Sequence, residues 1–107
     1  LWLDIDYQDE FKPFTWNAER FPDPAKMVGD LRAQGFRTVV IVDPHPTNEP
    51  GYRIFDEGVA GEHFVKNPDG TLYEGPVWPI NAPNKPGNSV FPDFTRPATR
   101  AWWGQQY

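Results

Sequence analysis

Cysteine is absent from the 107 residues of this chain. That absence excludes a disulfide framework, a thiol nucleophile and a zinc site built on thiolates, and it leaves the compartment open. The chain also lacks a basic cluster: 10 Lys and Arg stand against 15 Asp and Glu, a net charge of −5. We therefore expect no nucleic-acid partner. Long apolar runs are missing too, with a mean hydropathy of −0.67, so we expect no membrane partner.

Aromatic residues, by contrast, are abundant. They make up 16% of the chain and include five Trp, spread among 13 Pro and nine Gly. Disordered chains are poor in aromatic residues, so the prolines predict ordered loops. Loops that combine Trp with carboxylates are typical of sugar sites, where the C–H faces of a pyranose lie on aromatic rings and its hydroxyls bond to polar side chains.

The most apolar run is Arg37-Thr-Val-Val-Ile-Val-Asp-Pro44, in which residues 38–42 are all β-branched. Such side chains favour an extended backbone, and the lack of alternation predicts a parallel strand buried on both faces. The run stops at Asp43 and Pro44, a carboxylate followed by a residue that cannot continue a central strand. A buried strand that ends at a charged residue suggests the floor of an active site.

A second strand is predicted over residues 1–7, where apolar side chains alternate with Trp2, Asp4 and Asp6. The acidic face fits either a polar cleft or a solvated edge strand. Between the two strands, residues 23–35 predict a helix, with Asp23 as N-cap, proline in its first turn and glycine at its end. Strand, helix and strand then form one βαβ unit with parallel pairing.

The segment 44–95 contains no long periodic element as far as Trp78. A turn at Lys66-Asn-Pro-Asp-Gly-Thr71 predicts a small hairpin. A last helix is expected from about Arg96, with Thr95 as its N-cap and its Trp pair in the core. A connection this long is functional in most compact domains. The order of elements therefore predicts an α/β fold, namely a slice of a (β/α)8 barrel in which 44–95 is a long loop on the active-site side.

Seven short motifs then occur in order along the whole chain: Asp4-Ile-Asp-Tyr, Phe14-Thr-Trp, Phe21-Pro-Asp-Pro, Ile41-Val-Asp-Pro, Asp56-Glu-Gly, Val77-Trp-Pro, and Phe91-Pro-Asp-Phe-Thr with Ala101-Trp-Trp. Together they closely resemble glycoside hydrolase family 31, the α-glucosidase and α-xylosidase family. The resemblance implies a (β/α)8 catalytic barrel, of which residues 1–107 correspond to about strand 2 to helix 3. It also implies retaining hydrolysis of terminal α-linked glucose or xylose by two Asp, without a metal or another cofactor.

The resemblance places no catalytic residue in this chain, because the motifs that carry the family's nucleophile and acid/base are absent from it. It implies instead that Asp4, Ile41, Asp43 and Trp78 line the sugar pocket at subsite −1. Gln8 departs from the Met that is common in the family after Asp-Ile-Asp-Tyr, and residues 80–86 look like an insertion. The expected partners are an α-glucoside or a related oligosaccharide and the remainder of the barrel.

Several alternatives remain open at this stage. Both ends interrupt predicted elements, so we expect a segment of a longer protein. The rival hypothesis is a free-standing carbohydrate-binding module that holds a glucan without cleaving it. Asp6 fits a structural role better than a ligand role. The histidines and nearby acids match no metal-binding spacing, and the set considered is His45, His63, Asp56, Glu57 and Glu62.

Overall fold

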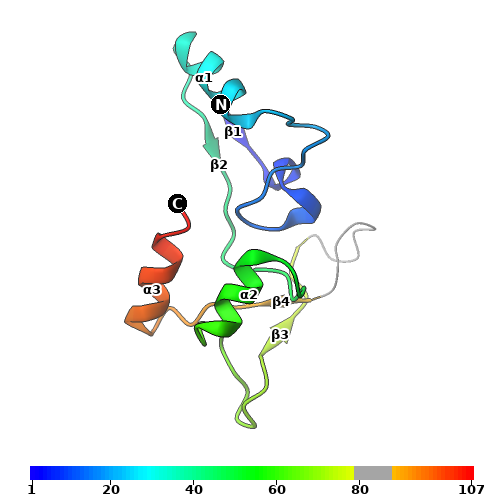
Figure 1. Cartoon of the computed structure of the whole chain (residues 1–107), viewed down its shortest axis with the longest axis vertical. Helices are drawn as coiled ribbons and strands as arrows, with labels where there is room; N and C mark the ends of the chain where they lie inside the picture. The colour runs from blue at the N-terminus through cyan, green and yellow to red at the C-terminus, as the bar shows by residue number, and fades with distance from the viewer. Residues whose placement is uncertain (79–87) are drawn as a thin grey trace. The chain divides into compact units, whose positions relative to one another are not determined.

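The computed structural model describes residues 1–78 and 88–107 and divides the chain into two compact units, Leu1–Val42 and Asp43–Tyr107 (Figure 1). Its elements in chain order are β1 (Trp2–Leu3), η1 (Ile5–Tyr7), η2 (Asp9–Phe11), α1 (Pro24–Ala33), β2 (Val39–Val40), α2 (Arg53–Ala60), β3 (Glu74–Gly75), β4 (Ser89–Val90) and α3 (Pro97–Gly104). Among the residues that are described, no helix is long and apolar enough to cross a membrane.

Helix α1 confirms the prediction from sequence at both ends. The Asp23 side chain accepts a hydrogen bond of 2.8 Å from the N–H of Lys26, and Pro24 opens the helix. Gly35 follows the C-cap with φ of 89°, a left-handed conformation that costs glycine little. Local capping chemistry therefore sets where this helix begins and ends.

Strands β1 and β2 pair in parallel, with Trp2 opposite Val39 and Leu3 opposite Val40, and Figure 1 shows them side by side. The predicted βαβ order is confirmed. Both strands are much shorter than predicted, however. The prediction of a strand buried on both faces is wrong for this chain, since Val39 is 42% exposed and Ile41 is 38% exposed. The reason is that β2 has one paired neighbour in a two-stranded sheet.

The alternating pattern over residues 1–7 is broken after Leu3. Residues Ile5–Tyr7 form a 3-10 turn instead of the rest of a strand. The loop that follows is packed: the Trp16 ring lies 4.7 Å from that of Tyr7 and 5.5 Å from that of Phe21. Asp6 helps to hold this loop through its backbone, because its carbonyl accepts a hydrogen bond from the Arg20 side chain. Contacts among these aromatic rings thus stabilise the part of the first unit that follows β1.

The second unit contains a helix that the sequence pattern failed to predict. Helix α2 spans Arg53–Ala60 and buries Ile54, Phe55 and Gly58. A Cβ at Gly58 would lie 2.2 Å from Cζ of Phe64, so glycine is required for the Phe64 ring to pack against the helix. Segment 44–95 is therefore partly a folded structure with its own helix.

Helix α3 packs a pair of tryptophans into the core of the second unit, as predicted. Trp102 and Trp103 are 9% and 8% exposed. The Trp102 ring stacks on His63 at 4.6 Å and meets Phe64 edge-on at 6.0 Å. The predicted N-cap is wrong: Arg96 holds that position without a side-chain cap, while the Thr95 hydroxyl donates to Asp93.

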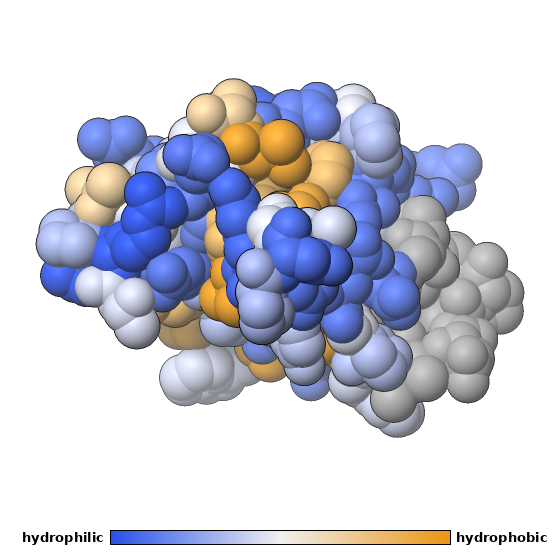
Figure 2. Space-filling view, turned by 90° about the horizontal axis from the view of Figure 1, so that it is seen from below, coloured by the Kyte–Doolittle hydropathy of each residue, from blue (hydrophilic) through white to orange (hydrophobic). Residues whose placement is uncertain are grey.

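The predicted hairpin is confirmed by a bridge between Lys66 and Leu72 and by a hydrogen bond of 2.8 Å from the Asn67 N–H to the Thr71 carbonyl. Beyond it, β3 pairs antiparallel with β4, and Val90 in β4 is fully buried. Hydrophobic side chains still reach the surface, as the orange areas in Figure 2 show. Among the described residues, the large ones more than a third exposed are Leu1, Trp2, Phe36, Val39, Ile41, Val59, Val65, Tyr73, Trp78, Phe94 and Tyr107.

Candidate functional site

Asp4 lies where β1 ends, and it is exposed. It is the N-cap of the 3-10 turn: its Oδ1 accepts a 2.7 Å hydrogen bond from the N–H of Ile5. Short acidic side chains compete for backbone N–H groups in this way and so end regular structure. One carboxylate oxygen is thereby fixed to the backbone, and this fixes the direction in which the exposed group points.

Ile41 lies directly after β2, and its backbone is held on both sides. Its N–H donates to the Leu3 carbonyl at 3.1 Å. Its carbonyl accepts hydrogen bonds from the Tyr7 hydroxyl at 2.8 Å and from the Gln8 amide at 3.3 Å. Because Leu3 precedes Asp4, the structure brings Asp4 and Ile41 to the ends of two adjacent strands, as the sequence predicted.

Tyr7 and Gln8 are 3% and 4% exposed, and the sequence analysis assigned neither of them a role. The alternating pattern placed Tyr7 at the end of a strand, and Gln8 lay just beyond it. The sequence did contain one hint, since Gln8 is an amide in a position where an apolar residue is common in the family it resembles. A buried amide needs hydrogen-bond partners, and the Ile41 carbonyl supplies one.

Asp43 begins the second unit and lies beside an imidazole. Its Oδ2 is 3.5 Å from Nε2 of His45, with the two side chains 40% and 22% exposed. A protonated His45 would attract this carboxylate, and a neutral one can donate a hydrogen bond to it. From the sequence, the only role weighed for His45 was that of a metal ligand. Within residues 1–78 and 88–107, no group of three side chains has the arrangement of a metal site.

Trp78 follows β3 and is 74% exposed. A ring with so little packing is free to lie against a ligand, which the sequence analysis predicted for it. The apparent insertion at 80–86 lies outside the described residues. Asp4 and Ile41 belong to the first unit, whereas Asp43 and Trp78 belong to the second.

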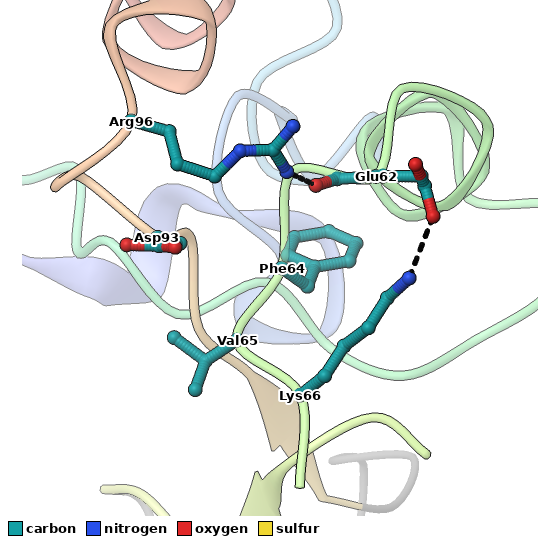
Figure 3. A pocket seen from close by; sticks show the side chains of 6 residues that line it. All are labelled: Glu62, Phe64, Val65, Lys66, Asp93 and Arg96. Atoms are coloured by element: carbon teal, nitrogen blue, oxygen red, sulfur yellow. Dashed lines mark hydrogen bonds and ion pairs between the residues drawn. The ribbon is translucent and has the colours of Figure 1, made fainter. Parts of the chain in front are cut away.

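A pocket of about 460 Å³ lies in the second unit, and none of these four residues lines it (Figure 3). It is lined by Glu62, Phe64, Val65, Lys66, Asp93 and Arg96. Figure 3 shows the charged side chains turned to partners within the unit: Lys66 Nζ lies 2.7 Å from Glu62 Oε1, and Arg96 donates to the Glu62 carbonyl. The hydrogen bond and charge of Lys66 lower the pKa of Glu62.

Asp93 completes this pocket, and it too is engaged locally. It accepts hydrogen bonds from the N–H and the hydroxyl of Thr95 at 3.1 and 2.5 Å. The hydroxyl hydrogen bond is the largest cause that lowers the pKa of the Asp93 carboxyl. The charged side chains of the pocket thus bond to neighbouring groups and hold the hairpin near the start of α3. We therefore assign the pocket a structural role.

Comparison with protein families gives one match that spans the entire chain. Residues 1–107 match the model described as the glycosyl hydrolases family 31 TIM-barrel domain. Among curated relatives, alpha-glucosidase 2 of Bacillus thermoamyloliquefaciens is 39% identical over 107 residues, which are 100% of this chain and 13% of that protein. Human neutral alpha-glucosidase AB is 40% identical over 107 residues, again 100% of this chain and 11% of that protein.

Solved structures agree with these matches. A glucosidase II alpha subunit, described as bound to alpha3-Glc2, superposes with a TM-score of 0.82 at 42% identity, covering 95% of this chain and 10% of that one. The family 31 alpha-glucosidase from Bacteroides thetaiotaomicron also gives 0.82, at 36% identity, over 100% of this chain and 17% of that one. The chain therefore spans only about a tenth to a sixth of the length of these relatives.

Proposed function

The chain belongs to glycoside hydrolase family 31, and from that membership we propose that it forms part of the catalytic barrel of a retaining α-glucosidase. In this role it covers about strand 2 to helix 3 of the (β/α)8 barrel. The observation that carries the proposal is the match of all 107 residues to the TIM-barrel domain of the family, with relatives named as α-glucosidases at 39–40% identity.

The surface of the first unit supports a place inside a larger sheet. β1 and β2 form only a two-stranded parallel sheet, yet parallel sheets are normally covered on both faces. Trp2 is 79% exposed, and Val39 and Ile41 are also open. Further barrel strands on the free edges and further helices on the outer face would cover this apolar surface.

The proposed contribution of the chain is sugar binding at subsite −1. Asp4 and Asp43 would accept hydrogen bonds from hydroxyls of the terminal glucose, and Trp78 would face the C–H side of the ring. Ile41 would close the pocket at the end of β2. A site built to pair hydroxyl groups rejects sugars that lack them, because acceptors that the rest of the barrel would bury are then left without a donor.

The chemistry itself would be done by residues outside these 107. Retention requires two carboxyls about 5–5.5 Å apart, one to attack the anomeric carbon and one to protonate the leaving oxygen and later activate water. The resemblance places both after the segments present here. The function of this chain would thus be to hold the −1 sugar in place for that pair.

A segment exchange tests the proposal directly. The matching segment of the Bacteroides thetaiotaomicron enzyme is replaced by these 107 residues, and release of nitrophenol from 4-nitrophenyl α-glucoside is measured. We expect turnover. Asp4→Asn should lower kcat/KM by about 10- to 100-fold, since a hydrogen bond to a charged group contributes about 1.5–3 kcal/mol. The matched control, Asp6→Asn, should change it by less than about threefold.

A folded chimera without turnover would contradict the proposal. The 107-residue chain alone supplies the complementary test, because it should show no turnover of the same substrate. The free-standing binding module is the rival that the exposed Trp78 favours. It predicts instead that the isolated chain melts cooperatively and binds maltose in calorimetry.

A further inference from the structure

The Ile41 carbonyl has hydrogen-bond partners that a parallel sheet does not explain. The Ile41 N–H donates to Leu3, and the Val39 N–H donates to Leu1 at 2.9 Å. In a regular parallel pair, the next hydrogen bond would run from the Ile5 N–H to the Ile41 carbonyl. That N–H donates to Asp4 Oδ1 instead, so the sheet ends one hydrogen bond early.

Two buried side chains replace the missing backbone donor. The Tyr7 hydroxyl donates to the Ile41 carbonyl at 2.8 Å, and the Gln8 amide donates to the same oxygen at 3.3 Å. Gln8 is also 3.4 Å from the Tyr7 hydroxyl. Tyr7 is the last residue of the turn that Asp4 caps, and Gln8 follows it directly. A closed ring of contacts therefore links Asp4, Tyr7, Ile41 and Leu3.

Because Tyr7 and Gln8 are buried, their hydrogen bonds to the Ile41 carbonyl cannot be replaced easily by water. Tyr7 and Gln8 are almost fully covered, and Trp16 packs on the Tyr7 ring. The Tyr7 carbonyl is itself held by the Asn17 N–H at 2.8 Å. A buried donor that loses its acceptor pays a desolvation penalty, so the Ile41 peptide is held in one orientation.

We propose that Tyr7 and Gln8 are positioning residues of the sugar pocket, which orient Ile41 and link its position to that of Asp4. This inference rests on the proposed function, because it concerns residues assigned there to the −1 sugar. Tyr7 and Gln8 touch no substrate. They fix the peptide from which the Ile41 side chain projects and from which the chain continues to Asp43.

The test uses the same chimera, with Tyr7→Phe and Gln8→Met as the principal variants. Each removes donors and keeps nearly the same volume. We expect each to lower kcat about five- to tenfold with KM changed less than twofold, because a misplaced pocket wall disturbs the transition state more than binding. The double variant should lose less kcat than the product of the two single-variant fold losses, since both donors bond to the same carbonyl oxygen.

Thr15→Val is the matched control. It removes a hydroxyl that donates to the Lys12 carbonyl at 2.6 Å and accepts from the Asp9 N–H, in the same loop but away from Ile41. It should lower the melting temperature as much as Tyr7→Phe does and leave kcat unchanged. Equal losses of kcat in Thr15→Val and Tyr7→Phe would mean that Tyr7 and Gln8 contribute only to stability, and this result would overturn the inference.

Gln8→Glu adds a readout that a purely structural residue would not give. A carboxylate cannot donate to the Ile41 carbonyl, but a protonated carboxyl can. The kcat of Gln8→Glu relative to the unmodified chimera should therefore recover as pH falls, whereas that of Gln8→Met should stay constant. A ratio independent of pH for both variants would count against positioning by hydrogen bond.

The two proposals fail in different ways. A folded but inactive parent chimera overturns the proposed function and this inference with it. An active parent whose Tyr7→Phe and Gln8→Met variants keep full kcat overturns the inference alone.

Discussion

The two units differ in how their apolar residues are covered. In the second unit, α2, the hairpin and α3 surround a core in which Ile54, Val90 and Trp102 are buried. In the first unit, α1 buries none of its side chains, and a groove of about 460 Å³ runs between this helix and the preceding loop. The long segment after β2 therefore makes its own core, whereas helix α1 of the βαβ segment contributes no buried side chain to one.

Removing Trp102 should break the second unit and spare the first. Trp102 stacks on His63 and meets Phe64 edge-on, so Trp102→Ala leaves a large cavity and should cost about 3–5 kcal/mol. Hydrogen exchange of the full chain, read peptide by peptide, checks this. We expect protection to fall in α2 and α3 and to persist in β1 and β2. Equal loss in both units would show that they unfold together.

The same chemical change should have opposite signs in the two units. Gly58→Ala would place a methyl 2.2 Å from the Phe64 ring and should destabilise by about 1–3 kcal/mol, as overpacking does. Gly29→Ala in α1 meets nothing within 4 Å and should stabilise by about 0.5–1 kcal/mol through helix propensity. Urea denaturation followed by far-UV circular dichroism measures both. A stabilising Gly58→Ala would refute the tight packing of α2.

Helix α1 should depend on its cap because it lacks buried contacts. Asp23→Ala removes the acceptor for the Lys26 N–H and should cost about 1 kcal/mol. The control is Asp30→Asn, which removes an exposed pair with Lys26 at 2.5 Å and should cost less than about 0.5 kcal/mol. Exchange rates of the α1 amides report the difference. Equal effects of the two changes would mean that the cap does not limit this helix.

The smallest expected effect is a pH dependence confined to the second unit. Burial, followed by the charge of Arg96, lowers the pKa of His63 below its ordinary 6.5. The unfolded chain then binds the proton more readily than the folded one. This contribution to stability is complete above pH 6.5 and is lost as pH falls from there to the folded pKa. In His63→Phe, the denaturation midpoint should change less between pH 7 and pH 5.5 than in the unmodified chain. An equal change of the midpoint with pH in both chains would refute this role of His63.

Local chemistry made part of this fold predictable from sequence. Asp23, Pro24 and Gly35 each act through their own backbone, so the bounds of α1 follow from residue type alone. Helix α2 escaped prediction because its eight residues include Gly58 and gain their helical state from contacts with Phe64, which lies beyond the helix. Short helices are marginal without such packing.

In the candidate site, too, local sequence features were predictable and long-range contacts were not. Motif resemblance selected Asp4, Ile41, Asp43 and Trp78, and the first two lie at neighbouring strand ends in the structure. Alternation over residues 1–7 could not reveal that the Asp4 carboxylate takes the N–H of Ile5. The hydrogen bonds from the buried residues Tyr7 and Gln8 to Ile41 span more than 30 residues, and a sequence pattern read locally cannot report them.

The contact between Gly58 and Phe64 also constrains how such chains can diverge. A Cβ on residue 58 would force the ring of residue 64 to shift, so the effect of a change at one position depends on the residue at the other. A lineage that acquires alanine at 58 before residue 64 is shortened passes through a destabilised intermediate, whereas the opposite order avoids this clash. We expect alignments of close relatives to show glycine at 58 wherever an aromatic residue stands at 64.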